Sequence, residues 1–179
     1  MNPHEIITKY YPESNAELRR ILLIHSNLVC NKALAICDAH PELGADRQFV
    51  EDGALLHDIG IFLTDAPTIY CFGTEHYLRH GFLGAELMRK EGFPTLARVC
   101  ERHTGAGLTA QTIQAEKLPL PPRDFVPETI EEKIICFADK FYSKNHLLEE
   151  KTPEQALHSL NRFGTEGAKR FQEWLHLFL

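Results

Sequence analysis

The sequence lacks a C-x-x-C spacing among its five cysteines. This argues against thiolate zinc sites and redox-active dithiols. An odd number of cysteines also offers no complete disulfide framework. We therefore expect buried, reduced thiols at Cys30, Cys37, Cys71, Cys100 and Cys136.

Long hydrophobic runs are also missing. The longest purely aliphatic run, 21–24, ends at His25, whereas a membrane-spanning helix needs ~20 apolar residues. The first five residues, Met-Asn-Pro-His-Glu, lack the basic and apolar stretches of a secretory signal peptide. We expect a cytoplasmic protein that does not bind a membrane.

The chain has no excess of positive charge. Its 19 lysines and arginines are outnumbered by 25 aspartates and glutamates, so the net charge is −6 over 179 residues. Nucleic-acid polymers need clustered basic side chains and are not the expected partner, although one positive site can still bind a small phosphate compound. The apolar share of 44% is enough for the core of one domain, expected to span 1–179.

Strand-like alternation is absent as well, and apolar residues follow helical spacing along most of the chain. Capping boxes begin at Ser14 and Thr129, and Pro153 stands at the favoured first position of another helix. The expected fold class is all-α. The pattern predicts helices over 14–39, 46–56, 74–91, 95–103 and 129–147, and two more between 152 and 179.

Two connections are longer than a compact bundle needs. One runs from Ile61 to Gly73 and the other from Thr104 to Pro127. Long loops in small domains often form the walls of a functional site. We expect both connections to wall a substrate cleft.

Four of the ten histidines lie on helix faces that are otherwise apolar, whereas His146 and His158 lie on polar faces. Two aspartates share this inward placement. A single buried histidine is usually a hydrogen-bonded core residue, but several unpaired polar groups are costly to bury together. We therefore expect one metal centre formed by His25, His57, Asp58, His80, His103 and Asp139.

The donor types indicate which metals fit. Imidazole and carboxylate ligands without thiolate suit Fe, Mn, Zn, Co or Ni. Six side chains exceed one tetrahedral site but suit two ions ~3.5–4 Å apart. Asp58 can reach both ions with its two oxygens. We therefore expect two divalent metal ions in the centre of the helical bundle.

The order of these residues resembles the HD-domain superfamily of metal-dependent phosphohydrolases, in its HDIG form. His25 precedes the motif His57-Asp58-Ile59-Gly60, and His80, Arg102-His103-Thr104-Gly105 and Ala138-Asp139 follow it. The resemblance covers roughly 18–145 and includes small single-domain members such as HD-type diadenosine tetraphosphate hydrolases; cyclic-di-GMP phosphodiesterases with HD domains are more distant. It implies an HD-domain bundle on which the helices of 152–179 pack.

The resemblance also implies how the ligands divide. His25, His57, Asp58 and Asp139 would hold the first ion, and His80, His103 and the bridging Asp58 the second. Relatives with a single metal typically lack the two extra histidines.

One position departs from the family pattern. Many relatives carry Lys or Glu three residues after the HD aspartate, where this chain has Ile61. Positive charge for a phosphate must then come from elsewhere. The candidate substrate-binding residues are Lys140, which directly follows a ligand, Arg102, and His76, which could protonate a leaving oxygen.

The resemblance implies a phosphohydrolase that cleaves a phosphate ester or anhydride of a nucleotide-like small molecule. Asp58 would be catalytic because it orients a metal-bridged hydroxide that attacks phosphorus. Two alternatives stay open: a di-iron oxygenase of the HD fold, which uses the same ligands, and a catalytically inactive nucleotide- or metal-binding module. The sequence also leaves open whether the chain forms a homodimer.

Overall fold

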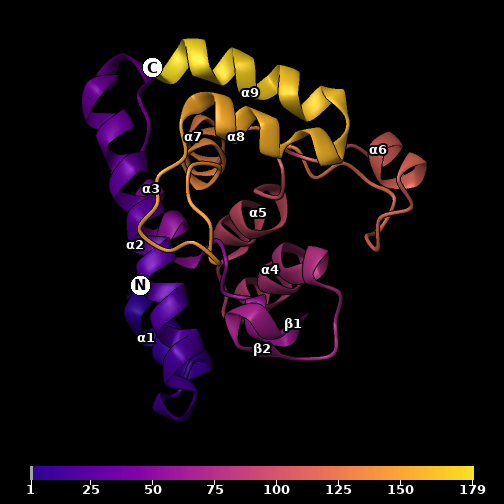
Figure 1. Ribbon diagram of the computed structural model, residues 1–179. Helices are drawn as coiled ribbons and strands as arrows, with labels where there is room; N and C mark the ends of the chain where they lie inside the picture. Colours follow the sequence, from indigo (N-terminus) through magenta and orange to yellow (C-terminus); the bar gives the residue numbers. More distant parts are fainter. Residues whose placement is uncertain (1) are drawn as a thin grey trace.

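The computed structural model describes residues 2–179 and confirms an all-α fold (Figure 1). In these residues the only sheet is a short antiparallel hairpin of β1 (Asp65–Ala66) and β2 (Cys71–Phe72). The helices are α1 (Pro3–Tyr10), α2 (Ala16–Ala39), α3 (Arg47–Leu56), α4 (His80–Lys90), α5 (Pro94–Arg102), α6 (Ala110–Ala115), α7 (Ile130–Asp139), α8 (Pro153–Ser159) and α9 (Thr165–Phe178).

Two predicted helices are too long. The helix expected over 74–91 begins only at His80, because the chain before it pairs with the hairpin region and then forms the 3-10 turn Tyr77–Arg79. The helix expected over 129–147 ends at Asp139, and residues 140–151 form a loop closed by a hydrogen bond from the Lys151 amide to the Phe141 carbonyl (2.8 Å).

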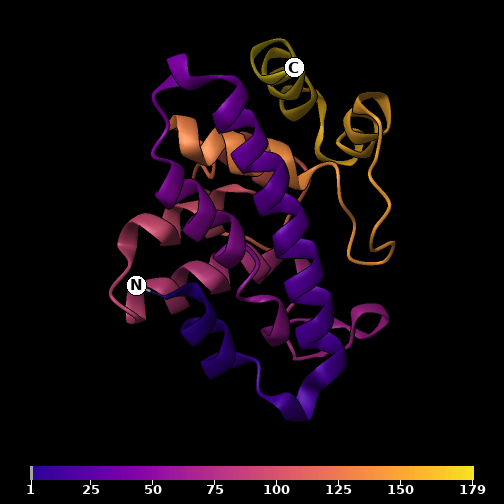
Figure 2. The same ribbon diagram turned by 90° about the vertical axis from the view of Figure 1, so that its left-hand side faces the viewer.

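Helix α1 has no counterpart among the predicted helices, although its sequence carries the signals of a helix start. The Asn2 side chain accepts a hydrogen bond from the His4 amide, and Pro3 stands at the first helical position. Ile6 and Ile7 are buried. They anchor α1 beside the N-terminal half of α2 (Figure 2).

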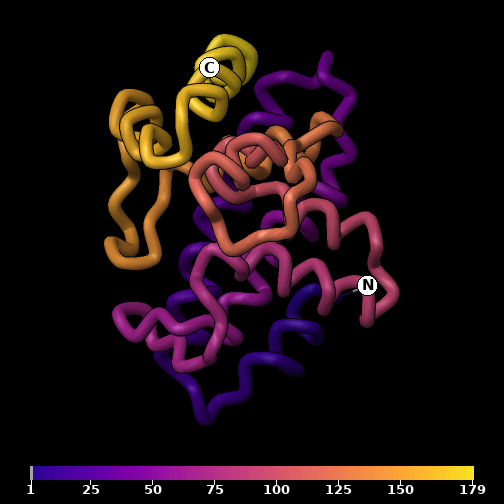
Figure 3. The backbone as a smooth tube through the Cα atoms, turned by 90° about the vertical axis from the view of Figure 1, so that its right-hand side faces the viewer, coloured from indigo at the N-terminus to yellow at the C-terminus, as the bar shows by residue number. Residues whose placement is uncertain are grey.

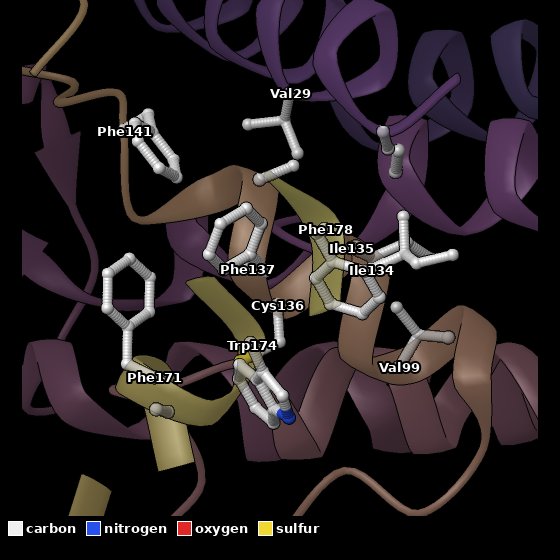
Figure 4. Close-up of a cluster of buried hydrophobic side chains, with 14 of the residues drawn as sticks. Val29, Val99, Ile134, Ile135, Cys136, Phe137, Phe141, Phe171, Trp174 and Phe178 are labelled. Carbon is white, nitrogen blue, oxygen red and sulfur yellow. The ribbon is translucent and has the colours of Figure 1, made fainter. Parts of the chain in front are cut away.

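The apolar core consists of two clusters. The upper cluster joins the C-terminal half of α2 to α3, α7, α8 and α9, and its centre is Phe137, which stacks on Phe171 with 5.0 Å between ring centroids (Figure 4). The lower cluster joins α1, the N-terminal half of α2, α4 and α5. On α2, His25 stands between Leu22 of the lower cluster and Val29 of the upper cluster.

Helix α2 spans the full height of the bundle (Figure 2). By length and composition alone, the segment Glu13–Ala39 could cross a membrane, and it is the one such helix in residues 2–179. Its buried side chains pack against α3 and α7. This packing is the behaviour of a core helix.

Candidate metal centre

Most of the metal-site residues predicted from the sequence lie at the ends of helices. His57 and Asp58 directly follow α3, His80 opens α4, His103 follows α5, and Asp139 ends α7. His25 comes from the middle of α2. All six side chains are buried, and the structure brings them together at one place in the bundle.

Two glycines make this approach of helix ends possible. A Cβ atom on Gly60 would lie 2.3 Å from the His80 carbonyl oxygen, and one on Gly81 would lie 2.4 Å from the Cys100 carbonyl oxygen. Any side chain at these positions would push α4 away from its neighbours. The glycine of the HDIG motif therefore brings the start of α4, and with it His80, beside Asp58.

The first ligand set consists of His25, His57, Asp58 and Asp139, whose donor atoms all lie within 4.8 Å of one another. His25 Nε2 lies 3.0 Å from Asp139 Oδ1 and 3.1 Å from Asp58 Oδ2. His57 Nε2 lies 3.0 Å from the same Asp58 oxygen.

The second ligand set consists of Asp58, His80 and His103. The two Nε2 atoms of His80 and His103 are 2.9 Å apart, and each lies 3.4 Å from Asp58 Oδ1. One oxygen of Asp58 thus faces the first set and the other faces the second. This geometry is compatible with a dinuclear site bridged by Asp58.

Backbone carbonyls fix the orientation of three of the imidazole rings. The Nδ1 atoms of His57, His80 and His103 donate to carbonyl oxygens three residues upstream, at 2.7, 2.6 and 2.7 Å. When Nε2 is unprotonated, each ring therefore directs the lone pair of that atom into the site, as metal-ligating histidines do.

The centre also holds buried polar atoms that lack hydrogen-bond partners within residues 2–179. They include His57 Nε2 and Asp58 Oδ1. Two imidazole lone pairs facing each other at 2.9 Å, as in His80 and His103, likewise need a cation between them. The residues present therefore fit divalent metal ions.

The pKa shifts favour the protonation states that a metal requires. Burial lowers the pKa of His80 to about 3, so its ring is neutral at pH 7. Burial opposes ionisation of both aspartates. Nevertheless, the charges of Lys144 and His57 hold the pKa of Asp58 well below its usual range. Lys140 and His25 do the same for the pKa of Asp139. Burial also opposes protonation of His57, but Asp58 and Asp139 raise its pKa to about 9. A bound cation would compete with that proton.

Two lysines from the loop after α7 reach the centre. Lys140 Nζ lies 2.6 Å from Asp139 Oδ2 and donates to the His103 carbonyl oxygen at 2.9 Å. Lys144 Nζ lies 2.5 Å from Asp58 Oδ2. Lys144 is not among the candidate residues selected from the sequence. Ile61, at the position where many relatives carry Lys or Glu, is fully buried in the lower cluster.

The centre opens into a cavity of about 650 Å³. His80, His103 and Asp139 form part of its lining, together with Lys140 and Lys144. Ala66, Thr68 and Ile69 of the hairpin region also line it. The connection 61–73 thus contributes a wall, as predicted.

The second predicted wall contributes little. From the connection 104–127 only Thr104 and Gly105 line the cavity. The remainder carries α6 and lies farther out, where the Pro119 carbonyl accepts from Arg79. The loop after α7 and the segment 158–163 form that wall instead, and Figure 3 shows the orange loop descending on the side of the magenta hairpin region.

Two of the three predicted substrate-binding residues lie outside the cavity lining. Arg102 forms ion pairs with Glu128 (3.0 Å) and Glu132 (3.2 Å), which hold its guanidinium away from the cavity. His76 is exposed, and its Nδ1 accepts from the Leu78 amide at the start of the 3-10 turn. Lys140 is the one that lines the cavity.

Comparison with known proteins agrees with the ligand pattern. The family model of the HD domain matches residues 22–143. The chain belongs to the HD domain family. All six metal-site residues of this HD domain lie within the matched range.

Curated relatives of the HD domain are longer proteins. A tRNA (cytidine(56)-2'-O)-methyltransferase of Picrophilus torridus is 35% identical over 154 residues, which are 81% of this chain and 40% of the relative. A protein of the same name from Thermoplasma volcanium is 35% identical over 88% of this chain and 41% of its own. An uncharacterised protein of Methanocaldococcus jannaschii is 44% identical over 60% of this chain and 55% of its own. The chain spans about half or less of these relatives.

Solved structures share the fold. The HD domain of the L. monocytogenes phosphodiesterase PgpH is 18% identical, with a TM-score of 0.56 over 96% of this chain and 93% of that one. The same domain in complex with cyclic-di-AMP gives a TM-score of 0.54 over 96% and 92%.

Proposed function

We propose that the protein is a metal-dependent phosphohydrolase that cleaves a phosphate ester or anhydride of a nucleotide-like small molecule. One observation carries the proposal: two buried ligand sets share Asp58, and they open into a cavity lined by Lys140 and Lys144. Cavities of this size accommodate small organic ligands. The cyclic-di-AMP complex of a structural neighbour supports a nucleotide-like ligand class.

The chain's residues divide the chemical work. Bound divalent ions would supply a water activated near neutral pH and neutralise charge on phosphoryl oxygens. Asp58 would orient that water, since its two oxygens face both ligand sets. Lys140 and Lys144 lie at the ligand carboxylates and can contact phosphoryl oxygens, so they supply the charge that Ile61 does not.

We do not assign to this chain the methyltransferase activity in the names of two relatives. This chain spans about 40% of the length of those proteins. The part that it shares carries the HD metal centre, which is suited to hydrolysis. We propose that the shared part acts on phosphate compounds whatever the remainder of those proteins does.

The test is turnover by the metal-reconstituted protein. The protein, loaded in turn with Mn, Fe, Zn, Co or Ni, is incubated with nucleotides, cyclic dinucleotides, dinucleoside polyphosphates and sugar phosphates. We expect phosphate or nucleotide release from one class, and no release by Asp139→Ala. Substrate loss coupled to oxygen consumption would instead identify a di-iron oxygenase. Tight nucleotide binding without turnover would identify a binding module.

A further inference from the structure

The cavity carries more positive charge than the metal centre uses. Its lining holds four cationic side chains, Lys140, Lys144, Lys151 and Arg162, and one carboxylate, Asp139. Lys140 and Lys144 are paired with the carboxylates of metal-site residues. No carboxylate of residues 2–179 forms an ion pair with Lys151 or Arg162. Two cations thus line the cavity without a protein counter-charge.

A backbone hydrogen bond and an aromatic contact hold these two cations near the centre. The Lys151 amide donates to the carbonyl of Phe141, two residues after Asp139. Arg162 lies over the ring of Phe163, 4.6 Å from its centroid. Phe163 in turn packs against Gly105, two residues after His103. Each cation is therefore tied to a segment that directly follows a metal-site residue.

The surroundings of Lys151 are themselves cationic. Its pKa is lowered because the side chain is half-buried and lies near Lys140, Arg162 and Lys144, with Asp139 the one acid that opposes the shift. A cluster of cations attracts a polyanion more strongly than a singly charged anion. Both residues also lie outside residues 22–143, the range that the HD family model matches.

We propose that Lys151 and Arg162 form a second anion subsite, which binds a phosphate group adjacent to the one at the metal centre. The substrate class is then a compound with two linked phosphates, such as a nucleoside diphosphate or a longer phosphoanhydride, in preference to a monoester. This inference rests on the proposed function. Lys151 and Arg162 are positioned as specificity residues and take no part in bond cleavage.

The test measures binding of two probes that are not hydrolysed. Calorimetry gives the Kd of methylenediphosphonate and of inorganic phosphate for the manganese-loaded protein. We expect Lys151→Ala and Arg162→Ala each to weaken methylenediphosphonate binding about 10-fold, the loss of one charge-assisted contact, and to change phosphate binding less than twofold. Lys169→Ala, an exposed lysine of α9 outside the cavity, is the matched control and should change neither. Metal analysis after titration shows that the ions are retained.

Equal weakening of both probes, or no change in either, would overturn the subsite. A different result would overturn the proposed function. In that case no phosphate compound is turned over, although the protein still prefers methylenediphosphonate to phosphate. Turnover of monoesters with no preference for the diphosphonate overturns the subsite alone.

Discussion

Asp58 is the one side chain that both ligand sets share. Its Oδ2 faces His25 and His57, whereas its Oδ1 faces His80 and His103. No other side chain within residues 2–179 belongs to both sets. The two parts of the centre therefore depend on one carboxylate.

We expect Asp58→Ala to lose all bound metal and to lower hydrolysis by roughly 100-fold or more, since even an outer partner of a metal ligand costs 10–100-fold when removed. His25→Ala removes a ligand of the first set only and should retain the metal of the second. Elemental analysis of the purified variants measures this difference. His176→Ala, an exposed histidine of α9, is the control. Equal metal loss in Asp58→Ala and His25→Ala would contradict the bridging role.

Lys144 serves as the counter-charge of Asp58 when no metal is bound. In the Lys144→Met variant, the buried carboxylate of Asp58 keeps its charge but loses its nearest cation. We expect metal-free Lys144→Met to lose about 3 kcal/mol of unfolding free energy, and the metal-bound form to lose much less, because the ions replace the lysine. Metal affinity should rise by linkage.

Urea unfolding with chelator and with excess Mn²⁺ measures both free energies. Lys169→Met provides the exposed-lysine control. A loss of the same size in both forms would show that Lys144 acts through packing and not through its charge.

The sequence could predict the metal-site residues but not the cations around the cavity. His25 and Asp139 stand on apolar helix faces, and the spacing of apolar residues along the sequence is enough to predict this placement. Lys151 and Arg162 lie near the site only because the chain leaves α7 at Asp139, which depends on tertiary contacts of the loop. The apolar spacing of Phe141 and its neighbours continued the helix pattern past that point, so the predicted helix was too long.

Among the elements, the junction of α3 and α4 depends on a small residue. The Cβ of Gly60→Ala would lie 2.3 Å from the His80 carbonyl oxygen and 2.4 Å from the Gly84 amide nitrogen, both backbone atoms. We expect Gly60→Ala to lower the unfolding free energy by about 3 kcal/mol, at the upper end for overpacking, and to weaken metal binding because His80 moves. Thermal denaturation and metal titration measure the two effects.

Gly167→Ala is the matched control for that substitution. Gly167 is buried within α9, and its added Cβ would meet Ala106 at an ordinary 3.8 Å. Alanine should stabilise the helix there by up to about 1 kcal/mol. A neutral Gly60→Ala would mean that α4 can move away without affecting the centre.

For the whole molecule, the metal centre lies where the two apolar clusters meet. Helices that carry metal-site residues contribute to both clusters. We expect chelator to lower the Tm of the entire protein by roughly 10 °C, since an ion at 1,000 times its Kd contributes about 4 kcal/mol and each kcal/mol shifts the Tm of a protein this size by about 2–4 °C.

Two probes test whether that loss is global. The fluorescence of Trp174 reports on the upper cluster, and it is the single tryptophan of the chain. Far-ultraviolet circular dichroism reports on all helices. The two transitions should coincide with and without chelator. Separate transitions after chelation would show that the clusters unfold independently of the centre.

The division of ligands along the chain also sets an order during synthesis. Asp58, His80 and His103 are all synthesised before Asp139, so the second ligand set is chemically complete while the first still lacks a carboxylate. Asp139 ends α7, the helix that carries Phe137 into the upper cluster. The nascent chain thus gains its final ligand and the centre of its larger core from the same few residues.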